Sequence, residues 1–105
     1  MDENNYNPRF DLIKYGPISP VNFSELFCCL RQIHGFTKNQ MSKIVNYSHH
    51  TISVNEKSTQ NPTIKTLLKY LLPLELEMVI NSNGITIRDP KSNFIIVKNW
   101  KVKFD

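Results

Sequence analysis

Residues 30–62 read LRQIHGFTKNQMSKIVNYSHHTISVNEKSTQNP, and this stretch carries the strongest fold signal in the chain. Thr37 followed three residues later by Gln40 has the form of a capping box, which predicts a short helix beginning after Thr37. Asn46 tolerates left-handed backbone angles and indicates a tight turn at the end of that helix. Ser48 is a favourable N-cap for a further short helix. Two short capped helices joined by a tight turn form the helix-turn-helix pattern, in which the second helix enters the DNA major groove.

The charge of this region is also typical of a DNA-binding module. Between Leu26 and Leu74 the chain carries six basic residues and a single acid, Glu56, whereas the full 105 residues carry a net charge of +4. The basic residues are Arg31, Lys38, Lys43, Lys57, Lys65 and Lys69. A cationic module with nearly neutral flanks is the electrostatic pattern of phosphate binding. We therefore expect double-stranded DNA as a partner.

One helix is expected before the helix-turn-helix and one after it. Ser19 and Pro20 are typical of a helix start, and apolar residues then recur at helical spacing up to Gly35. Thr63 is the expected N-cap of the last helix, and Pro73 disrupts its end. The expected buried stripes comprise Phe23, Leu26, Phe27, Leu30 and Ile33 in the first helix, and Ile64, Leu67, Leu68, Leu71 and Leu72 in the last.

After the last helix the apolar residues alternate, which predicts strands in place of helices. The first expected strand carries Leu74, Leu76, Met78 and Ile80 on alternate positions. Turns at residues 82–84 and 89–93 separate it from a second strand around Thr86 and a third strand that runs from Phe94 to Phe104. Such short strands after a helical module favour a compact β extension.

These patterns predict a mainly α-helical fold with a C-terminal β part. Residues 1–18 form an N-terminal arm that docks on the body or on a partner. Residues 19–73 form a helix-turn-helix domain of four to five helices. Residues 74–105 form a β extension that serves dimerisation or partner binding.

Several classes of protein do not fit the sequence. No apolar run approaches the roughly 18 residues needed to span a bilayer, so we expect no membrane partner. Cys28 and Cys29 are adjacent, and the strain of bridging neighbours predicts reduced thiols in a cytoplasmic protein. Neighbouring His49 and His50 lack further ligands at metal-binding spacing. Without a glycine-rich phosphate loop, a Ser/His/Asp set or paired inward carboxylates, the sequence predicts no enzyme, cofactor or metal.

The chain resembles the lambda-repressor-like (Xre-type) helix-turn-helix family over residues 30–62, without a gap. The matching residues are Leu30-Arg31, Gly35-Phe36-Thr37, Met41-Ser42, Ser48, Thr51-Ile52-Ser53, Glu56 and Asn61-Pro62. Four positions depart from the family pattern, namely Lys38, Asn46, Asn55 and Ser58. Over residues 18–80 the chain is similar to HipB-like antitoxins, autorepressors that partner HipA-type Ser/Thr kinase toxins. This second resemblance rests on Ile18-Ser19-Pro20, on Thr63 with Leu67-Leu68-Lys69-Tyr70-Leu71, and on Leu74-Glu75-Leu76-Glu77-Met78.

The resemblance implies roles for particular residues. The expected base contacts are His49, His50, Ser53 and Val54, and the expected phosphate contacts are Thr37, Lys38, Ser48 and Lys57. A structural ion pair is expected between Arg31 and Glu56. A strand containing Leu74, Leu76, Met78 and Ile80 is expected to pair with its copy in a second subunit. The implied protein is a homodimer that binds a palindromic operator and partners a HipA-type kinase toxin of one or two chains.

Some alternatives stay open at this stage. Trp100 and Phe104 are either an exposed anchor for a partner or part of the hydrophobic face of the C-terminal sheet. A solitary Xre-type regulator without a kinase would carry the same motifs. A protein-interaction module that neutralises a toxin without binding an operator is a third reading, which the unusual Asn55 and Ser58 favour.

Overall fold

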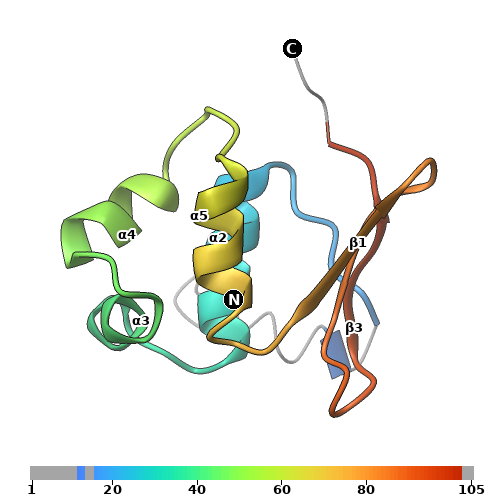
Figure 1. Ribbon diagram of the computed structural model, residues 1–105, viewed down its shortest axis with the longest axis horizontal. Helices are drawn as coiled ribbons and strands as arrows, with labels where there is room; N and C mark the ends of the chain where they lie inside the picture. Colours follow the sequence, from blue (N-terminus) through green and yellow to red (C-terminus); the bar gives the residue numbers. More distant parts are fainter. Residues whose placement is uncertain (1–11, 14–15, 103–105) are drawn as a thin grey trace, which may run out of the picture.

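The computed structural model describes residues 12–13 and 16–102 (Figure 1). The elements run in the order α2 (Phe23–Ile33), α3 (Lys38–Val45), α4 (His49–Asn55), α5 (Ile64–Leu71), β1 (Glu77–Asn81), β2 (Gly84–Arg88) and β3 (Ile95–Trp100). Most of the expected N-terminal arm, and Phe104, lie outside the described residues.

Helices and sheet occupy opposite sides of the molecule. Figure 1 shows α3 and α4 on one side, the sheet on the other, and α2 with α5 between them. The three strands pair antiparallel in the order β1-β2-β3. The predicted combination of helices followed by a C-terminal β part is therefore confirmed.

Local capping signals place three of the four helix starts as predicted. The capping box of Thr37 and Gln40 is present at α3, and Asn46 closes α3 in the left-handed region at φ 59°. The Ser48 side chain accepts a hydrogen bond from the Thr51 N–H at the start of α4, and Thr63 caps α5 in the same way. α4 ends at Asn55, with Glu56 as its C-cap.

The start of α2 differs from the prediction. Its N-cap is Asn22, whose side chain accepts from the Glu25 N–H at 2.9 Å, in place of Ser19 and Pro20. The preceding segment is held by β3 instead. The Ile18 N–H donates to the Ile96 carbonyl at 2.8 Å, and the Trp100 indole donates to the Pro20 carbonyl at 2.7 Å.

The first strand also begins later than the alternation predicts. A turn with Glu75 at φ 56° follows α5, and the Leu76 N–H donates to the Leu71 carbonyl at 3.0 Å. Leu76 is consequently buried in the core, and the strand starts only at Glu77. The turn that closes α5 and the burial of Leu76 in the core therefore keep residues 74–76 out of the strand that their alternating pattern predicts.

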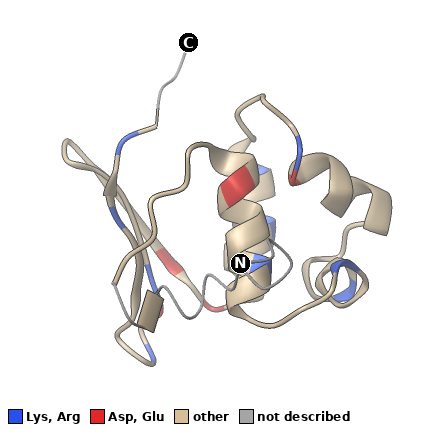
Figure 2. Ribbon diagram, turned by 180° about the vertical axis from the view of Figure 1, so that it is seen from behind, with Lys and Arg blue, Asp and Glu red and all other residues tan. Residues whose placement is uncertain are grey.

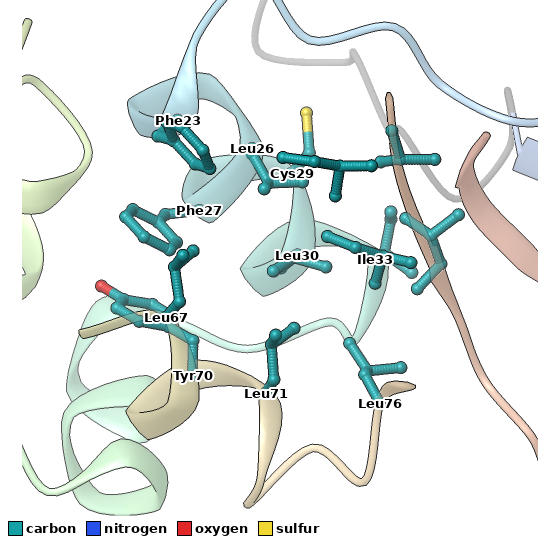
Figure 3. Close-up of a cluster of buried hydrophobic side chains, with 14 of the residues drawn as sticks. Phe23, Leu26, Phe27, Cys29, Leu30, Ile33, Leu67, Tyr70, Leu71 and Leu76 are labelled. Carbon is teal, nitrogen blue, oxygen red and sulfur yellow. The ribbon is translucent and has the colours of Figure 1, made fainter. Parts of the chain in front are cut away.

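Helices and sheet share one hydrophobic core. Figure 3 shows side chains of α2 and α5 facing each other in it, and the Phe27 and Tyr70 rings stack at 4.2 Å between centroids. From the sheet, Ile87 and Val97 are fully buried. Trp100 is 8% exposed and meets the Phe23 ring edge-on at 5.0 Å. Of the two alternatives for Trp100, the structure shows the one in which it completes the hydrophobic face of the sheet.

Candidate nucleic-acid interface

Helix α4 has one buried and one exposed face. Ile52 is fully buried and fixes the helix against the core. His49, His50 and Val54 are exposed, and Ser53 is half-buried between them. The four residues expected to contact bases therefore lie on or beside the outward face of α4. An exposed helix of this kind fits the width of the DNA major groove, where its side chains can reach the hydrogen-bonding groups on the base edges.

The surface beside α4 is hollowed. His50, Ser53, Val54 and Lys57 line a shallow groove together with the loop that follows, residues 58–60. Figure 2 shows that α4 itself carries no Lys, Arg, Asp or Glu. Side chains on α4 thus offer hydrogen bonds and apolar contact, which suit bases, while the exposed ammonium of Lys57 suits a phosphate.

Three of the four expected phosphate contacts lie at the starts of α3 and α4, whereas Lys57 follows the end of α4. Thr37 accepts from the Gln40 N–H at 3.1 Å, and the Gln40 side chain accepts from the Thr37 N–H at 2.8 Å. Lys38 follows as the first residue of α3 and is half-buried. At α4 the Ser48 hydroxyl accepts from the Thr51 N–H at 3.1 Å. Helix N-termini carry partial positive charge, so both starts are favourable places for anions.

An ion pair holds the C-terminal end of α4. The Glu56 carboxylate accepts from the Arg31 Nε at 2.8 Å and from its Nη2 at 3.0 Å, as the resemblance implies. The remaining Nη1 of Arg31 donates to the Phe36 carbonyl at 3.0 Å. The Glu56 hydrogen bond raises the pKa of Arg31 above its ordinary value. One guanidinium thereby ties together α2, the turn before α3 and the end of α4.

A second link to α4 was not predicted. The Asn55 Nδ2 donates to the Tyr70 hydroxyl at 3.3 Å, joining α4 to α5. Tyr70 is fully buried, and this burial raises its pKa to about 12. Asn55 departs from the family pattern, in which this position is apolar. A polar residue here was the sequence signal that could have predicted a polar partner for Asn55 in the core.

The second departure near the end of α4 also has a structural explanation. The Ser58 N–H donates to the Val54 carbonyl at 2.9 Å, and the Ser58 hydroxyl accepts from the Gln60 N–H at 3.1 Å. Ser58 therefore closes the last turn of α4 and shapes the loop that lines the groove. Neither departure indicates that the helix-turn-helix has lost its geometry.

The cysteines show no sign of reactivity. Cys28 and Cys29 are both free. Burial raises the pKa of both thiols, that of Cys29 to about 12.

Across residues 12–13 and 16–102, no three His, Cys, Asp or Glu side chains are grouped to hold a metal ion. In that same part of the chain, no helix has the length and apolar character to cross a membrane.

Two curated relatives match most of the chain. Antitoxin HipB of Escherichia coli K12 is 32% identical over 62 residues, which cover 59% of this chain and 70% of the relative. The chain belongs to the HipB antitoxin family. A second HipB antitoxin, from Escherichia coli O6:H1, is 29% identical over 72 residues, which cover 68% of this chain and 77% of the relative. No protein-family model and no solved structure matches the chain.

In this HipB family member, the residues expected at a dimer interface lie in different environments. Leu76 is buried in the core of its own chain, and Leu74 packs partly against that core. Met78 and Ile80 lie on β1, where Met78 is half-buried and Ile80 is 65% exposed. β1 pairs with β2 alone among the described strands, so its other edge is available.

Proposed function

We propose that the chain is a sequence-specific DNA-binding autorepressor and the antitoxin of a HipA-type kinase toxin system. The observation that carries this proposal is the exposed, uncharged face of α4, held at both ends within a cationic helix-turn-helix. His49, His50, Ser53 and Val54 would contact base edges. Thr37, Lys38, Ser48 and Lys57 would contact phosphates. Binding of this kind at its own promoter would repress the operon by occupying it.

A dimer is part of the proposal, because one short helix offers few base contacts. Two copies related by a two-fold axis would bind a palindromic operator with half-sites about one helical turn apart. The available edge of β1 supports this arrangement, since an unpaired strand edge readily pairs with another strand. Val79 and Ile80, 42% and 65% exposed, would be covered by the second copy.

The kinase toxin belongs to the proposal through the family. Both curated relatives are named Antitoxin HipB, and we propose a HipA-type kinase of one or two chains as the protein partner in the cytoplasm. The flanks of the dimer remain free of DNA in this arrangement and would receive the kinase. A kinase-like reading frame beside the gene would distinguish this proposal from a solitary Xre-type regulator.

The test compares variants of single side chains on DNA from the chain's own promoter. His50→Ala should weaken operator binding by about 1–3 kcal/mol and relax sequence preference at one position of each half-site. Lys57→Ala should weaken operator and scrambled DNA alike and reduce the salt dependence of binding by about one phosphate contact. Lys98→Ala, an exposed cation on β3, is the matched control and should change neither.

Equal effects of His50→Ala on operator and scrambled DNA would contradict base reading by α4. Negligible binding of the unaltered chain to its promoter, together with a tight complex with a toxin, would favour the interaction-module alternative. The departures of Asn55 and Ser58 from the family pattern favoured that alternative. Their hydrogen bonds give both residues a role in the folded helix-turn-helix, so these departures no longer favour it.

A further inference from the structure

A pocket lies where the C-terminal end of α2 meets the turn between β2 and β3, and we call it the turn pocket. It has a volume of about 310 Å³ and is lined by Leu12, Ile13, Ile33, His34, Asp89, Ser92 and Phe94. Figure 1 shows this end of the sheet, with residues 12–13 in blue beside it, on the side of the molecule away from α4. Most of the lining residues also lie outside residues 18–80, over which the chain resembles HipB antitoxins. The turn pocket is therefore separate from the candidate nucleic-acid interface.

Apolar side chains form much of the turn pocket. Leu12 and Ile33 are 6% and 8% exposed and belong to the core, whereas Ile13 and Phe94 are 61% and 50% exposed. The Gly16 N–H donates to the Leu12 carbonyl at 3.1 Å, which holds Leu12 in place. Large apolar side chains that are exposed together beside a pocket are typical of an interaction site.

Asp89 places a negative charge in the turn pocket. Its carboxylate accepts from the Lys91 N–H at 2.9 Å, and this hydrogen bond lowers the pKa of Asp89 below its ordinary value. The ammonium of Lys91 pairs with Glu75 instead. Among the described residues, no ion pair includes Asp89. The carboxylate is therefore charged at neutral pH and still has room for a cation.

His34 adds a second acceptor to the turn pocket. Its Nδ1 lies 2.7 Å from the Leu30 carbonyl oxygen, and Nδ1 donates this bond because a carbonyl only accepts. The neutral ring then keeps Nε2 as an acceptor. The Ser92 hydroxyl is already in use, since it accepts from the Phe94 N–H at 3.3 Å and hydrogen-bonds to Asp89. The polar groups left for a ligand are therefore acceptors, which suit a ligand rich in N–H donors.

We infer that the turn pocket binds the arginine side chain of a protein partner. The methylene stem would pack against Leu12 and Ile33, and the guanidinium would donate to Asp89 and His34. A guanidinium has several N–H donors in one plane and no acceptor, so it matches a carboxylate beside an imidazole acceptor. It also stacks on an aromatic ring such as Phe94, which the compact ammonium of lysine does less well.

The surroundings of the turn pocket favour a protein as the source of the arginine. A free arginine would bring its own carboxylate, and no Lys or Arg lines the turn pocket to receive it. A peptide backbone has no such charge, and apolar neighbours of the arginine would cover the exposed Ile13 and Phe94. A purely apolar segment would bury the charge of Asp89 without a partner. This inference depends on neither DNA binding nor the proposed dimer.

The test is a titration of the full chain, followed by the NMR signals of its backbone amides. The probe is the peptide acetyl-Leu-Arg-Leu-amide, which should shift the signals of residues 33–34 and 89–94 with a Kd of about 1 mM or tighter. The same peptide with citrulline in place of arginine keeps the shape but loses the charge. It should bind at least about fivefold more weakly.

Single variants locate the site of binding. Asp89→Asn keeps a side-chain oxygen for the Lys91 N–H, so the turn is preserved, but it should weaken binding of the arginine peptide about fivefold. Phe94→Ala should weaken it about two- to fivefold through the loss of stacking. Glu25→Gln is the matched control, since this exposed acid lies at the opposite end of α2, and its Kd should stay within about twofold. The amide spectrum of each variant verifies that it folds.

Several results would overturn the inference. Equal binding of the arginine and citrulline peptides would refute recognition of a cation. Unchanged binding in both Asp89→Asn and Phe94→Ala would place the peptide elsewhere, and the absence of any shift at about ten times the expected Kd would refute the site itself. Free L-arginine that binds as tightly as the peptide would show a site for a small molecule, which contradicts a protein partner.

Discussion

Replacement of Glu56 by Ala tests how strongly the ion pair holds α4. The Glu56 side chain is 4% exposed and that of Arg31 is 14% exposed. Two hydrogen bonds, at 2.8 and 3.0 Å, join the carboxylate to the guanidinium. Removing one partner of a buried pair leaves an uncompensated charge, at a cost of about 3–5 kcal/mol. Arg31 keeps its bond to the Phe36 carbonyl and some contact with water, so we expect a loss near 3 kcal/mol.

Urea denaturation followed by circular dichroism measures this loss. With a slope of about 1–3 kcal/mol per molar urea for small proteins, the midpoint should fall by about 1–3 M. The slope itself should stay unchanged, because the variant keeps the same buried surface.

Glu77→Ala provides the matched control. Glu77 pairs with Arg88 at 2.6 Å, but the two side chains are 45% and 42% exposed. An exposed pair contributes less than about 1 kcal/mol, so this variant should change the midpoint little. A loss for Glu56→Ala no larger than that for Glu77→Ala would refute the reasoning from burial.

Three further predictions concern stability. Ser48→Ala removes the N-cap of α4 and should lower the free energy of unfolding by about 1 kcal/mol, as measured by thermal denaturation; an unchanged melting temperature would contradict the role of the cap. Gly84→Ala should destabilise by at least about 1 kcal/mol in urea, because a Cβ would lie 2.6 Å from the Trp100 carbonyl oxygen at a backbone φ of +123°, and a neutral result would refute this close approach. Burial raises the pKa of Cys29 and of Tyr70 to about 12, from 9.0 and 10.0 respectively, so both groups stay neutral in the folded chain after the unfolded chain ionises. Stability should therefore be intact below about pH 9 and fall as the pH rises towards 12, and urea midpoints that stay constant between about pH 8 and pH 10.5 would contradict this assignment.

The parts of the fold predicted from sequence are those determined by short-range interactions. The capping box at Thr37, the left-handed Asn46 and the cap at Ser48 each depend on groups within a few residues of one another. Their geometry follows from local hydrogen bonds between side chains and backbone and from the left-handed backbone of Asn46, so the helix-turn-helix could be anticipated. The residues expected to contact bases on α4 came from the family resemblance.

The differences arise where distant parts of the chain meet. Ser19 and Pro20 look like a helix start, but the Trp100 indole holds the Pro20 carbonyl against the sheet, 80 residues away in sequence. Leu76 fits a strand pattern, yet the core draws it into the turn after α5. The contact of Asn55 with Tyr70 likewise joins two helices that periodicity treats separately. Patterns within one element carry no information about which neighbour that element will meet.

The most direct test of DNA recognition is fluorescence anisotropy of the unaltered chain on its own promoter and on a scrambled duplex, at two salt concentrations. A repressor of this kind should bind the promoter at least about 10³-fold more tightly, with affinity for both duplexes falling steeply as salt rises. Equal, weak binding to the two duplexes would contradict the proposal that α4 reads an operator.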